Sequence, residues 1–291
     1  MKTSTLLKKV RQIEIKTKGL SNHIFAGEYH TAFKGTGMAF SEVREYQSGD
    51  DIRSIDWNVT ARYNNPFVKV FEEEREMTVM LVIDISKSGN FGTNNQLKRE
   101  LISEIAAVLS FSAIKNQDKV GVILFTDIVE KFIPPRKGKN HILRIIREIL
   151  SFQPKNKKTD LKAALEHLNL IMKKRSICFI LSDFMTPTFN KPLKTANKRH
   201  DLVGLRIYDK REDSLLNMGL VHIKNTETDE LLLVDTTSRK TRESFSRKRK
   251  KNIEKIENTF HKNGIDLIEM NTEEDYIKPL INFFKTRGRR K

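Results

Sequence analysis

The sequence predicts an α/β protein with a mostly parallel β-sheet and helices on both faces. From residue 77 onward, apolar runs of strand length alternate with stretches whose apolar residues recur at helical spacing, and this pattern is typical of such a sheet. A length of 291 residues allows one large core with a smaller companion. Hydrophobic residues make up 38% and charged residues 31% of the chain, which favours a folded globular protein over a disordered one.

The first elements of the predicted sheet are two strands with a helix between them. Residues 77–84 form an apolar strand, and residues 119–126 form the next one. The helix between them ends near Asn116 and has one apolar stripe, formed by Leu97, Leu101, Ile105, Val108 and Phe111. Residues 128–133 are predicted to form a short strand across a tight turn. Pro134-Pro135 should end that strand, because proline cannot donate to a ladder.

Two helices and two strands are expected next. The inward stripes of the helices are Ile142, Ile145, Ile146 and Ile149, and then Leu161, Leu165, Leu168 and Met172. Residues 177–183 are predicted to be a central strand because they begin with an uninterrupted apolar run. Residues 200–208 are predicted to be a further strand of the same sheet.

The last part of the chain contains a predicted insertion. Two short runs, within residues 219–235 and on either side of a polar turn, indicate an inserted β-hairpin. A long basic helix over residues 238–263 should end at Gly264, a usual C-terminal cap residue. Residues 265–270 then form a strand, and a last helix carries Ile277, Leu280, Ile281 and Phe284 inward.

The first 76 residues differ from the rest. Beyond an opening helix at about residues 5–16, they show little periodicity, and they contain the only tryptophan, Trp57. We therefore divide the chain into an N-terminal extension, residues 1–76, packed on a main domain formed by residues 77–291.

Charge and hydropathy narrow the functional classes. The formal net charge is +17, but the basic residues are separated along the chain and lack interleaved aromatic residues for base stacking. We expect no specific nucleic-acid binding, while peripheral contact with an anionic membrane stays open. The sequence has no apolar run of membrane-spanning length and no signal-peptide pattern, which predicts a cytoplasmic protein. The single cysteine, Cys178, lies in an apolar strand and should be buried.

Oxygen-bearing side chains follow the predicted strand at 77–84. Asp84, Ser86 and Ser88 supply one carboxylate and two hydroxyls in the loop after this strand. Hard cations such as Mg²⁺ prefer oxygen ligands and retain several waters. The same residue types also cap helices and turns, so this loop alone favours capping.

Two further loops make capping alone a less complete explanation of these side chains. Thr159 precedes an amphipathic helix, and Asp183 ends the apolar strand at 177–183. Ligands of open parallel sheets bind in the crevice outside the carboxyl ends of the strands. The three loops, which carry Asp84, Ser86, Ser88, Thr159 and Asp183, are therefore expected to converge on one edge of the sheet.

This ordered set resembles the metal-ion-dependent adhesion site of von Willebrand factor A domains, which are Rossmann-like α/β domains. Residues 26–76 are similar to the signature region of the domain-of-unknown-function 58 family, and the resemblance covers nearly the whole chain. It implies a bacterial cytoplasmic protein, bound Mg²⁺ or Mn²⁺, and association with a MoxR-type AAA+ ATPase in chaperone-like or assembly roles. One departure is Gly89-Asn90-Phe91, where many relatives have methionine after the second serine.

We expect a non-enzymatic, metal-dependent protein-binding module. Two carboxylates leave a divalent ion nearly neutralised but not saturated, so an Asp or Glu of an unidentified client protein could complete the shell. One alternative is a Mg²⁺-dependent phosphoester hydrolase that uses the same oxygens. Another is electrostatic binding of nucleic acid or anionic membrane through a basic helix carrying residues 247–251.

Other polar residues have simpler explanations. Asp50, Asp51 and Asp56 fit a Gly-Asp-Asp turn better than a second metal cluster, and the acidic run at 72–76 fits a solvated strand edge. The Gly35-Thr36-Gly37 segment is too short to cradle a phosphate, and no nucleotide-binding loop motif occurs. Ser86 lacks the nucleophile-elbow pattern of hydrolases.

Overall fold

A computed structural model of the chain describes residues 3–20, 29, 32–33, 38–73, 76–90, 92, 97–156, 158–186, 189–224 and 231–290. The chain forms two compact units: unit 1 comprises Met1–Phe33 and Thr78–Lys291, and unit 2 comprises Lys34–Met77. This division differs from the predicted boundary at residue 76. The opening helix belongs to unit 1, because Val10 and Ile13 are buried in one apolar cluster with Ala107.

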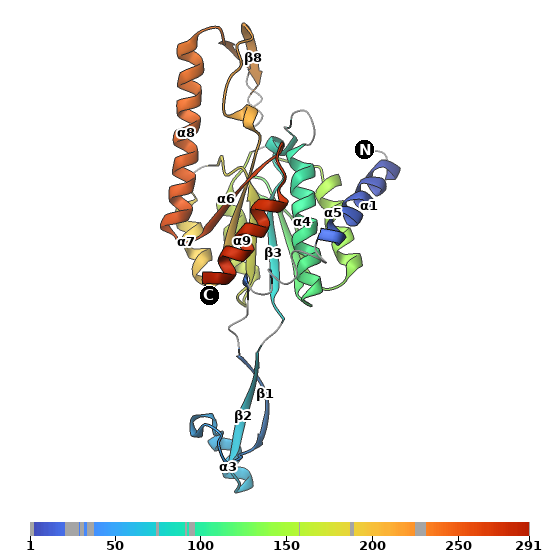
Figure 1. Cartoon of the computed structure of the whole chain (residues 1–291), viewed down its shortest axis with the longest axis vertical. Helices are drawn as coiled ribbons and strands as arrows, with labels where there is room; N and C mark the ends of the chain where they lie inside the picture. The colour runs from blue at the N-terminus through green and yellow to red at the C-terminus, as the bar shows by residue number, and fades with distance from the viewer. Residues whose placement is uncertain are drawn as a thin grey trace. The chain divides into compact units, whose positions relative to one another are not determined.

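Unit 1 is built on a six-stranded sheet in the order β10-β7-β6-β3-β4-β5 (Figure 1). All neighbouring pairs are parallel except β4 with the edge strand β5. The strands are β3 (Thr78–Asp84), β4 (Lys119–Phe125), β5 (Val129–Arg136), β6 (Ile177–Ser182), β7 (Asp201–Tyr208) and β10 (Asp266–Asn271). The central strands are buried along almost their whole length. This sheet confirms the predicted fold class.

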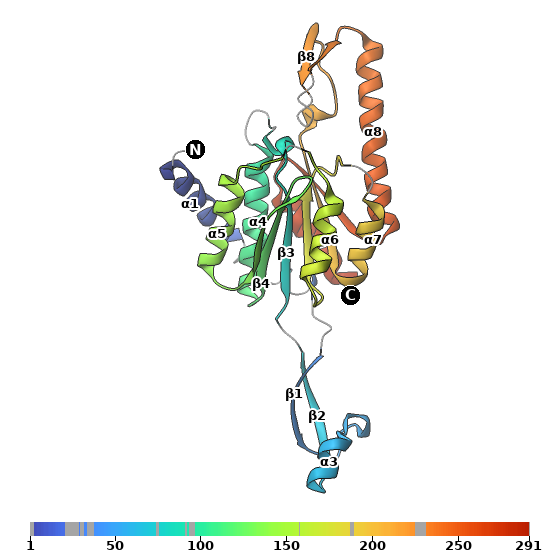
Figure 2. The same ribbon diagram turned by 180° about the vertical axis from the view of Figure 1, so that it is seen from behind.

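Helices cover both faces of the sheet. One face carries α4 (Lys98–Lys115) with α1 (Thr3–Leu20), α5 (Lys139–Ser151) and α9 (Ile277–Arg290) around it. The other face, in front in Figure 2, carries α6 (Leu161–Ile171), α7 (Asn190–Arg199) and the second half of α8 (Arg239–Lys262). Leu165, Leu193 and Phe260 bring these three helices into one core cluster with β3 and β6.

Two elements of unit 1 differ from the prediction. Helix α7 was not predicted, because its ten residues have only Leu193 and Ala196 buried and lack a full apolar stripe. Strand β5 continues through Pro134-Pro135 to Arg136, although the prolines were expected to end it. As an edge strand with irregular register, β5 leaves its proline nitrogens outside the ladder.

After β7, the short helix η4 (Lys210–Glu212) leads into the antiparallel hairpin of β8 (Leu220–Lys224) and β9 (Leu231–Asp235). This pairing confirms the predicted hairpin, whose turn at 225–230 lies outside the described residues. Helix α8 then returns to the sheet, and its buried residues, Ile256 and Phe260, are both in its second half. No helix in the described ranges is long and apolar enough to cross a membrane.

Unit 2 is an antiparallel hairpin of β1 (Met38–Glu45) and β2 (Phe67–Glu73), with η2 (Ile52–Ser54) and α3 (Trp57–Tyr63) in its connection. The carboxylates expected in a turn have structural partners there. Asp51 and Asp56 accept hydrogen bonds from backbone N–H groups at the starts of η2 and α3. Asp50 accepts hydrogen bonds from the Arg44 guanidinium at 2.7 Å, which lowers the pKa of Asp50 to about 2. The Gly35-Thr36-Gly37 segment lies outside the described residues.

Candidate metal centre

The carboxyl ends of β3 and β6 lie side by side. Their parallel register pairs Ile83 with Leu181, so Asp84 and Ser182 are the next residues on neighbouring strands. The Ser182 hydroxyl donates to Asp84 Oδ2 at 2.8 Å. The same hydroxyl accepts from the Phe184 N–H at 3.0 Å, so one buried serine connects the ends of both strands.

The loop after β3 folds back on its aspartate. The Ser86 N–H donates to Asp84 Oδ1 at 2.9 Å, which forms a tight Asx turn. Ser86 Oγ and Ser88 Oγ are 3.0 Å apart. The three oxygen-bearing side chains of the predicted motif therefore gather within one turn, before and at the start of η3 (Lys87–Asn90).

Asp183 is held by two groups from different elements. Its Oδ1 accepts from the Met185 N–H at 3.1 Å, and its Oδ2 lies 3.4 Å from the ammonium nitrogen of Lys98 on α4. The residue after it, Phe184, has a φ of 57°, a left-handed conformation that is unusual for a bulky side chain. Its aromatic ring is buried against Phe260 of α8, with the ring centroids 4.8 Å apart, and this packing holds the turn in place.

Thr159 lies on a third loop, and the structure joins this loop to the one that carries Asp183. The Thr186 hydroxyl donates to the Thr159 carbonyl oxygen at 2.9 Å. Asp160 caps α6 by accepting from the Lys162 N–H at 2.8 Å. Thr159 itself is 5% exposed. The three loops expected to converge therefore do so, at the carboxyl edge of the sheet.

Burial and charge oppose ionisation of Asp84. Its side chain is 5% exposed, and burial raises the pKa of Asp84 to about 6, with a further upward contribution from the nearby negative charge of Asp183. Hydrogen bonds from Ser86 and Ser182 lower the pKa but do not offset these effects. Two carboxylates brought together in a buried position need a positive charge beside them.

The donor atoms fit a hard divalent cation. Asp84, Ser86, Ser88, Thr159 and Asp183 offer only oxygen, and both carboxylates are already oriented by hydrogen bonds from the loops. Among the described residues, no three histidine, cysteine, aspartate or glutamate side chains form a metal-binding group. A metal at this edge would therefore depend on two carboxylates together with hydroxyl and water oxygens.

Lys98 is a site residue that the sequence analysis did not find. We expected Leu97 to begin the inward stripe of its helix, but Leu97 is 40% exposed and Lys98 is 2% exposed. The Lys98 ammonium lies between Asp183 and Glu212 of η4, at 2.5 Å from Glu212 Oε1. Glu212 also pairs with Arg249 of α8 at 3.2 Å. The buried lysine therefore links Asp183 to the segment that leads to the hairpin.

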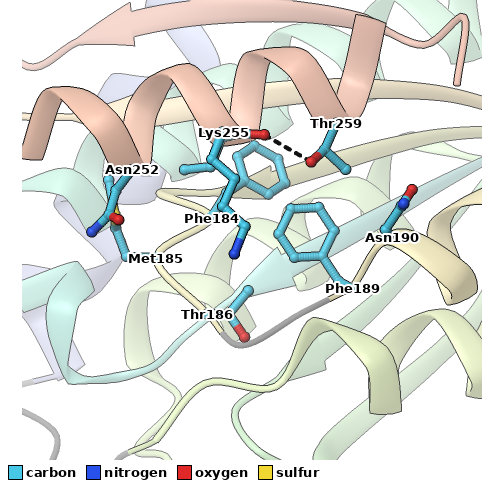
Figure 3. Close-up of a pocket in the computed structure, with 9 residues that line it drawn as sticks. Phe184, Met185, Thr186, Phe189, Asn190, Asn252, Lys255 and Thr259 are labelled. Atoms are coloured by element: carbon cyan, nitrogen blue, oxygen red, sulfur yellow. Dashed lines mark hydrogen bonds between the residues drawn. The ribbon is translucent and has the colours of Figure 1, made fainter. Parts of the chain in front are cut away.

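A cavity of about 440 Å³ adjoins the loop after Asp183 (Figure 3). Phe184 and Phe189 form an apolar wall on one side. On the other side is α8, where the Thr259 hydroxyl donates to the Lys255 carbonyl oxygen at 2.7 Å. Asn190 and Asn252 add amide groups to the lining, so the cavity has both aromatic and amide walls.

Comparisons with known proteins identify relatives and structural neighbours. A family model described as "Protein of unknown function DUF58" matches residues 42–255. An uncharacterized protein of Mycobacterium tuberculosis is 27% identical over 283 residues, which cover 96% of this chain and 89% of the relative. Two solved structures are an aerotolerance-related membrane protein of Bacteroides fragilis (13% identity, 74% of this chain, 100% of that chain, TM-score 0.49) and the SpRpn10 VWA domain (11%, 71%, 94%, 0.39).

Proposed function

The chain belongs to the DUF58 family of proteins of unknown function, whose model matches residues 42–255, and we propose that it is a metal-dependent protein-binding module. One observation carries this proposal. Asp84 is buried beside a second aspartate, Asp183, and its burial together with the negative charge of Asp183 raises the pKa of Asp84. Two carboxylates and three hydroxyl side chains at one sheet edge suit a cation that a partner's carboxylate can also reach.

Side chains from three loops would coordinate the ion. Asp84, Ser86 and Ser88 would hold Mg²⁺ or Mn²⁺ from the first loop, and Thr159 and Asp183 would do so from the other two, with Asp183 direct or through water. A bound ion would supply a positive charge that attracts an Asp or Glu of a client protein. Ser182 orients Asp84 by its 2.8 Å hydrogen bond, and the Lys98 ammonium orients Asp183.

We propose binding rather than catalysis. The Ser86 hydroxyl bonds to the Ser88 hydroxyl at 3.0 Å, so within the described loop it has no histidine partner that would make it a nucleophile. Both carboxylates accept hydrogen bonds from nearby backbone N–H groups, an arrangement that keeps them fixed as ligands. The proposed setting is the bacterial cytoplasm, with a MoxR-type AAA+ ATPase as the partner that drives assembly or maturation of a client complex.

Calorimetric titration with Mg²⁺ and Mn²⁺ tests the metal site. Wild-type protein should release or absorb heat on binding, and Asp84→Asn should not. A matched control is Ser110→Ala, because Ser110 is a buried serine of α4 whose hydroxyl has no hydrogen-bond partner among the described residues. Equal heats for the wild type and Asp84→Asn, with both proteins folded, would show that the ion binds elsewhere.

Co-purification from the native host tests the partner. In the presence of Mg²⁺ and ATP, the tagged wild-type chain should recover an AAA+ ATPase, and the Asp84→Asn variant should recover less of it or of the client. Recovery of other proteins but no AAA+ ATPase would reject the pairing while leaving the calorimetric result unaffected.

A further inference from the structure

One part of unit 1 projects from the sheet in both views (Figures 1 and 2). We call it the arm: residues 213–224 and 231–251, which contain the β8–β9 hairpin and the first half of α8. It is held together near the sheet, where the Arg249 guanidinium pairs with Asp213 at 3.2 Å, and at the start of α8, where the Arg242 guanidinium donates to the Thr236 carbonyl oxygen at 2.5 Å. The arm therefore extends from the carboxyl edge of β7 as one connected structure.

The arm exposes a concentration of large apolar side chains. Of the fifteen large hydrophobic residues exposed in the described ranges, seven lie within residues 216–245. Their exposed fractions are Leu216 57%, Met218 63%, Leu220 69%, Leu231 65%, Leu232 59%, Leu233 60% and Phe245 37%. Single exposed leucines need no explanation, but so many on one projecting element indicate a surface that a partner covers.

Both faces of the hairpin carry apolar side chains, and the face away from α8 also includes the positions of His222, Lys224 and Asp235. The register pairs Ile223 with Leu232, and His222 with Leu233, and side chains alternate between faces along a strand. Leu232 and Val234 therefore face α8, where they line a hollow of about 520 Å³ with Phe245. Leu231 and Leu233 lie on the opposite face. Three consecutive exposed leucines thus place apolar surface on the two sides of a two-stranded sheet, which is marginal alone in water.

The helix beside the hairpin is strongly basic. Helix α8 has ten lysines and arginines against three glutamates. One of those glutamates, Glu243, pairs with Arg239 at 2.6 Å. Residues 247–251 are all basic, and Lys250 and Lys251 are exposed to solvent. The arm therefore places positive charge next to its apolar side chains.

We propose that the arm docks onto an anionic lipid bilayer. The leucines of the hairpin enter the interface, and the lysines and arginines of α8 contact the headgroups. The face of the hairpin away from α8 combines Leu231 and Leu233 with Lys224 in the strand register, and leucines next to basic residues suit the interface of an anionic bilayer. A nucleic acid would use the positive charge but would leave the leucines in water. The inference is independent of the proposed metal site.

Vesicle co-sedimentation with the full chain tests the inference. Wild type should bind vesicles of phosphatidylcholine mixed with phosphatidylglycerol and should bind pure phosphatidylcholine far more weakly, in buffer containing EDTA so that no metal takes part. Lys250→Gln/Lys251→Gln should lower the partition coefficient about thirtyfold, since each surface lysine contributes about fivefold. Leu231→Ser/Leu233→Ser should lower it by about tenfold or more.

Matched controls test whether binding depends on the arm or on any exposed lysine or leucine. Lys278→Gln/Lys285→Gln removes two exposed lysines of α9, and Leu170→Ser removes an exposed leucine of α6; both should bind as wild type does. Equal binding to the two vesicle types, or unchanged binding of Leu231→Ser/Leu233→Ser, overturns the proposal. Wild type that ignores anionic vesicles overturns it as well and favours an acidic protein as the occupant. Duplex DNA bound equally by wild type and the leucine variant would favour a nucleic acid.

Discussion

The Asp84 carboxylate is buried at the end of β3, and Asp183 follows the neighbouring strand. The pKa of Asp84 is raised from 3.8 to about 6, so its ionised form is less stable in the folded protein than in the unfolded chain. The contribution of Asp84 to stability is therefore full below pH 3.8 and is lost as the pH rises through about 6. At neutral pH the negative charge of Asp84 therefore destabilises the metal-free fold.

Asp84→Asn should accordingly stabilise the protein at pH 7 without metal. Asparagine retains the acceptor for the Ser86 N–H and removes the charge, so the free energy of unfolding should rise by about 1–3 kcal/mol. Urea unfolding in EDTA measures this gain. Added Mg²⁺ should then stabilise the wild type but not the variant. A less stable variant in EDTA would contradict the electrostatic explanation.

Lys98 compensates two carboxylates from a buried position, with its ammonium between Asp183 and Glu212. Lys98→Met should lower the free energy of unfolding by about 3 kcal/mol, because it removes the ammonium beside Asp183 and leaves Glu212 with Arg249 alone. The double variant Lys98→Met/Glu212→Gln should lose less than the two single variants added together. Strict additivity in urea unfolding would show that the ion pair contributes nothing.

His200 makes the fold sensitive to acid. Burial, assisted by the positive charges of Arg199 and Arg175, lowers the pKa of His200 from 6.5 to about 4. Between these values the unfolded chain binds the proton and the folded protein does not, so stability falls as the pH drops below about 6.5. His200→Asn should remove roughly 2 kcal/mol of this loss between pH 6.5 and 4.5.

Asparagine can keep the bond that His200 Nδ1 makes with the Ser176 hydroxyl at 3.0 Å. Urea unfolding at several pH values measures the effect. His261→Asn, an exposed position on α8, should follow the wild-type curve. Parallel pH curves for His200→Asn and the wild type would place the acid sensitivity elsewhere.

Asp84 and Asp183 could be predicted as neighbours because each follows an uninterrupted apolar run, and parallel strands bring their carboxyl ends to one edge. Lys98 could not. It lies at the first residue of α4, where a shift of one position decides whether Leu97 or Lys98 points inward, and apolar periodicity favours the leucine. Only the position of Glu212, far away in the sequence, explains why the buried residue is the lysine.

At the scale of elements, α8 packs closely against the sheet at one glycine of β7. A Cβ atom at Gly204 of β7 would lie 2.5 Å from a ring carbon of Phe260, so the helix packs against bare backbone there. Gly204→Ala should lower the free energy of unfolding by about 1–3 kcal/mol through overpacking. The double variant Gly204→Ala/Phe260→Leu should lose less than the sum of both single variants. Additive losses in urea unfolding would contradict this contact.

The parallel strands were predictable because they are buried on both faces, which produces continuous apolar runs. The hairpin of unit 2 and helix α7 were not. Strands β1 and β2 alternate polar and apolar residues only in part, because their pairing shifts register near Phe40. No alternating pattern therefore continues over the whole length of either strand. Helix α7 contributes only two buried residues, which is too few to produce a stripe. The sequence pattern of an element therefore predicts its structure better when the element buries more of its surface.

At the scale of the whole molecule, the division into units depends on contacts that are distant in sequence. Helix α1 belongs with unit 1 because Val10 and Ile13 pack near Ile142 and Ile146 of α5, more than a hundred residues later in the chain. Its own sequence indicates a helix but not the surface that the helix covers. The boundary predicted at residue 76 therefore grouped α1 with a hairpin that forms a compact unit of its own.

Because unit 2 is compact in itself, unit 1 should fold without it. Met38 and Glu73 are paired across the antiparallel ladder, so their Cα atoms are only about 5 Å apart. A short Gly-Ser linker can therefore replace residues 38–73. The free energy of unfolding of unit 1 should change by less than about 0.5 kcal/mol, and the heat of Mg²⁺ binding should equal that of the full chain. Asp84→Asn in the shortened chain is the control without metal binding. Every proposed ligand lies in unit 1, so the site should remain intact in the shortened chain. A folded deletion variant that no longer binds Mg²⁺ would instead show that unit 2 contributes to the metal site.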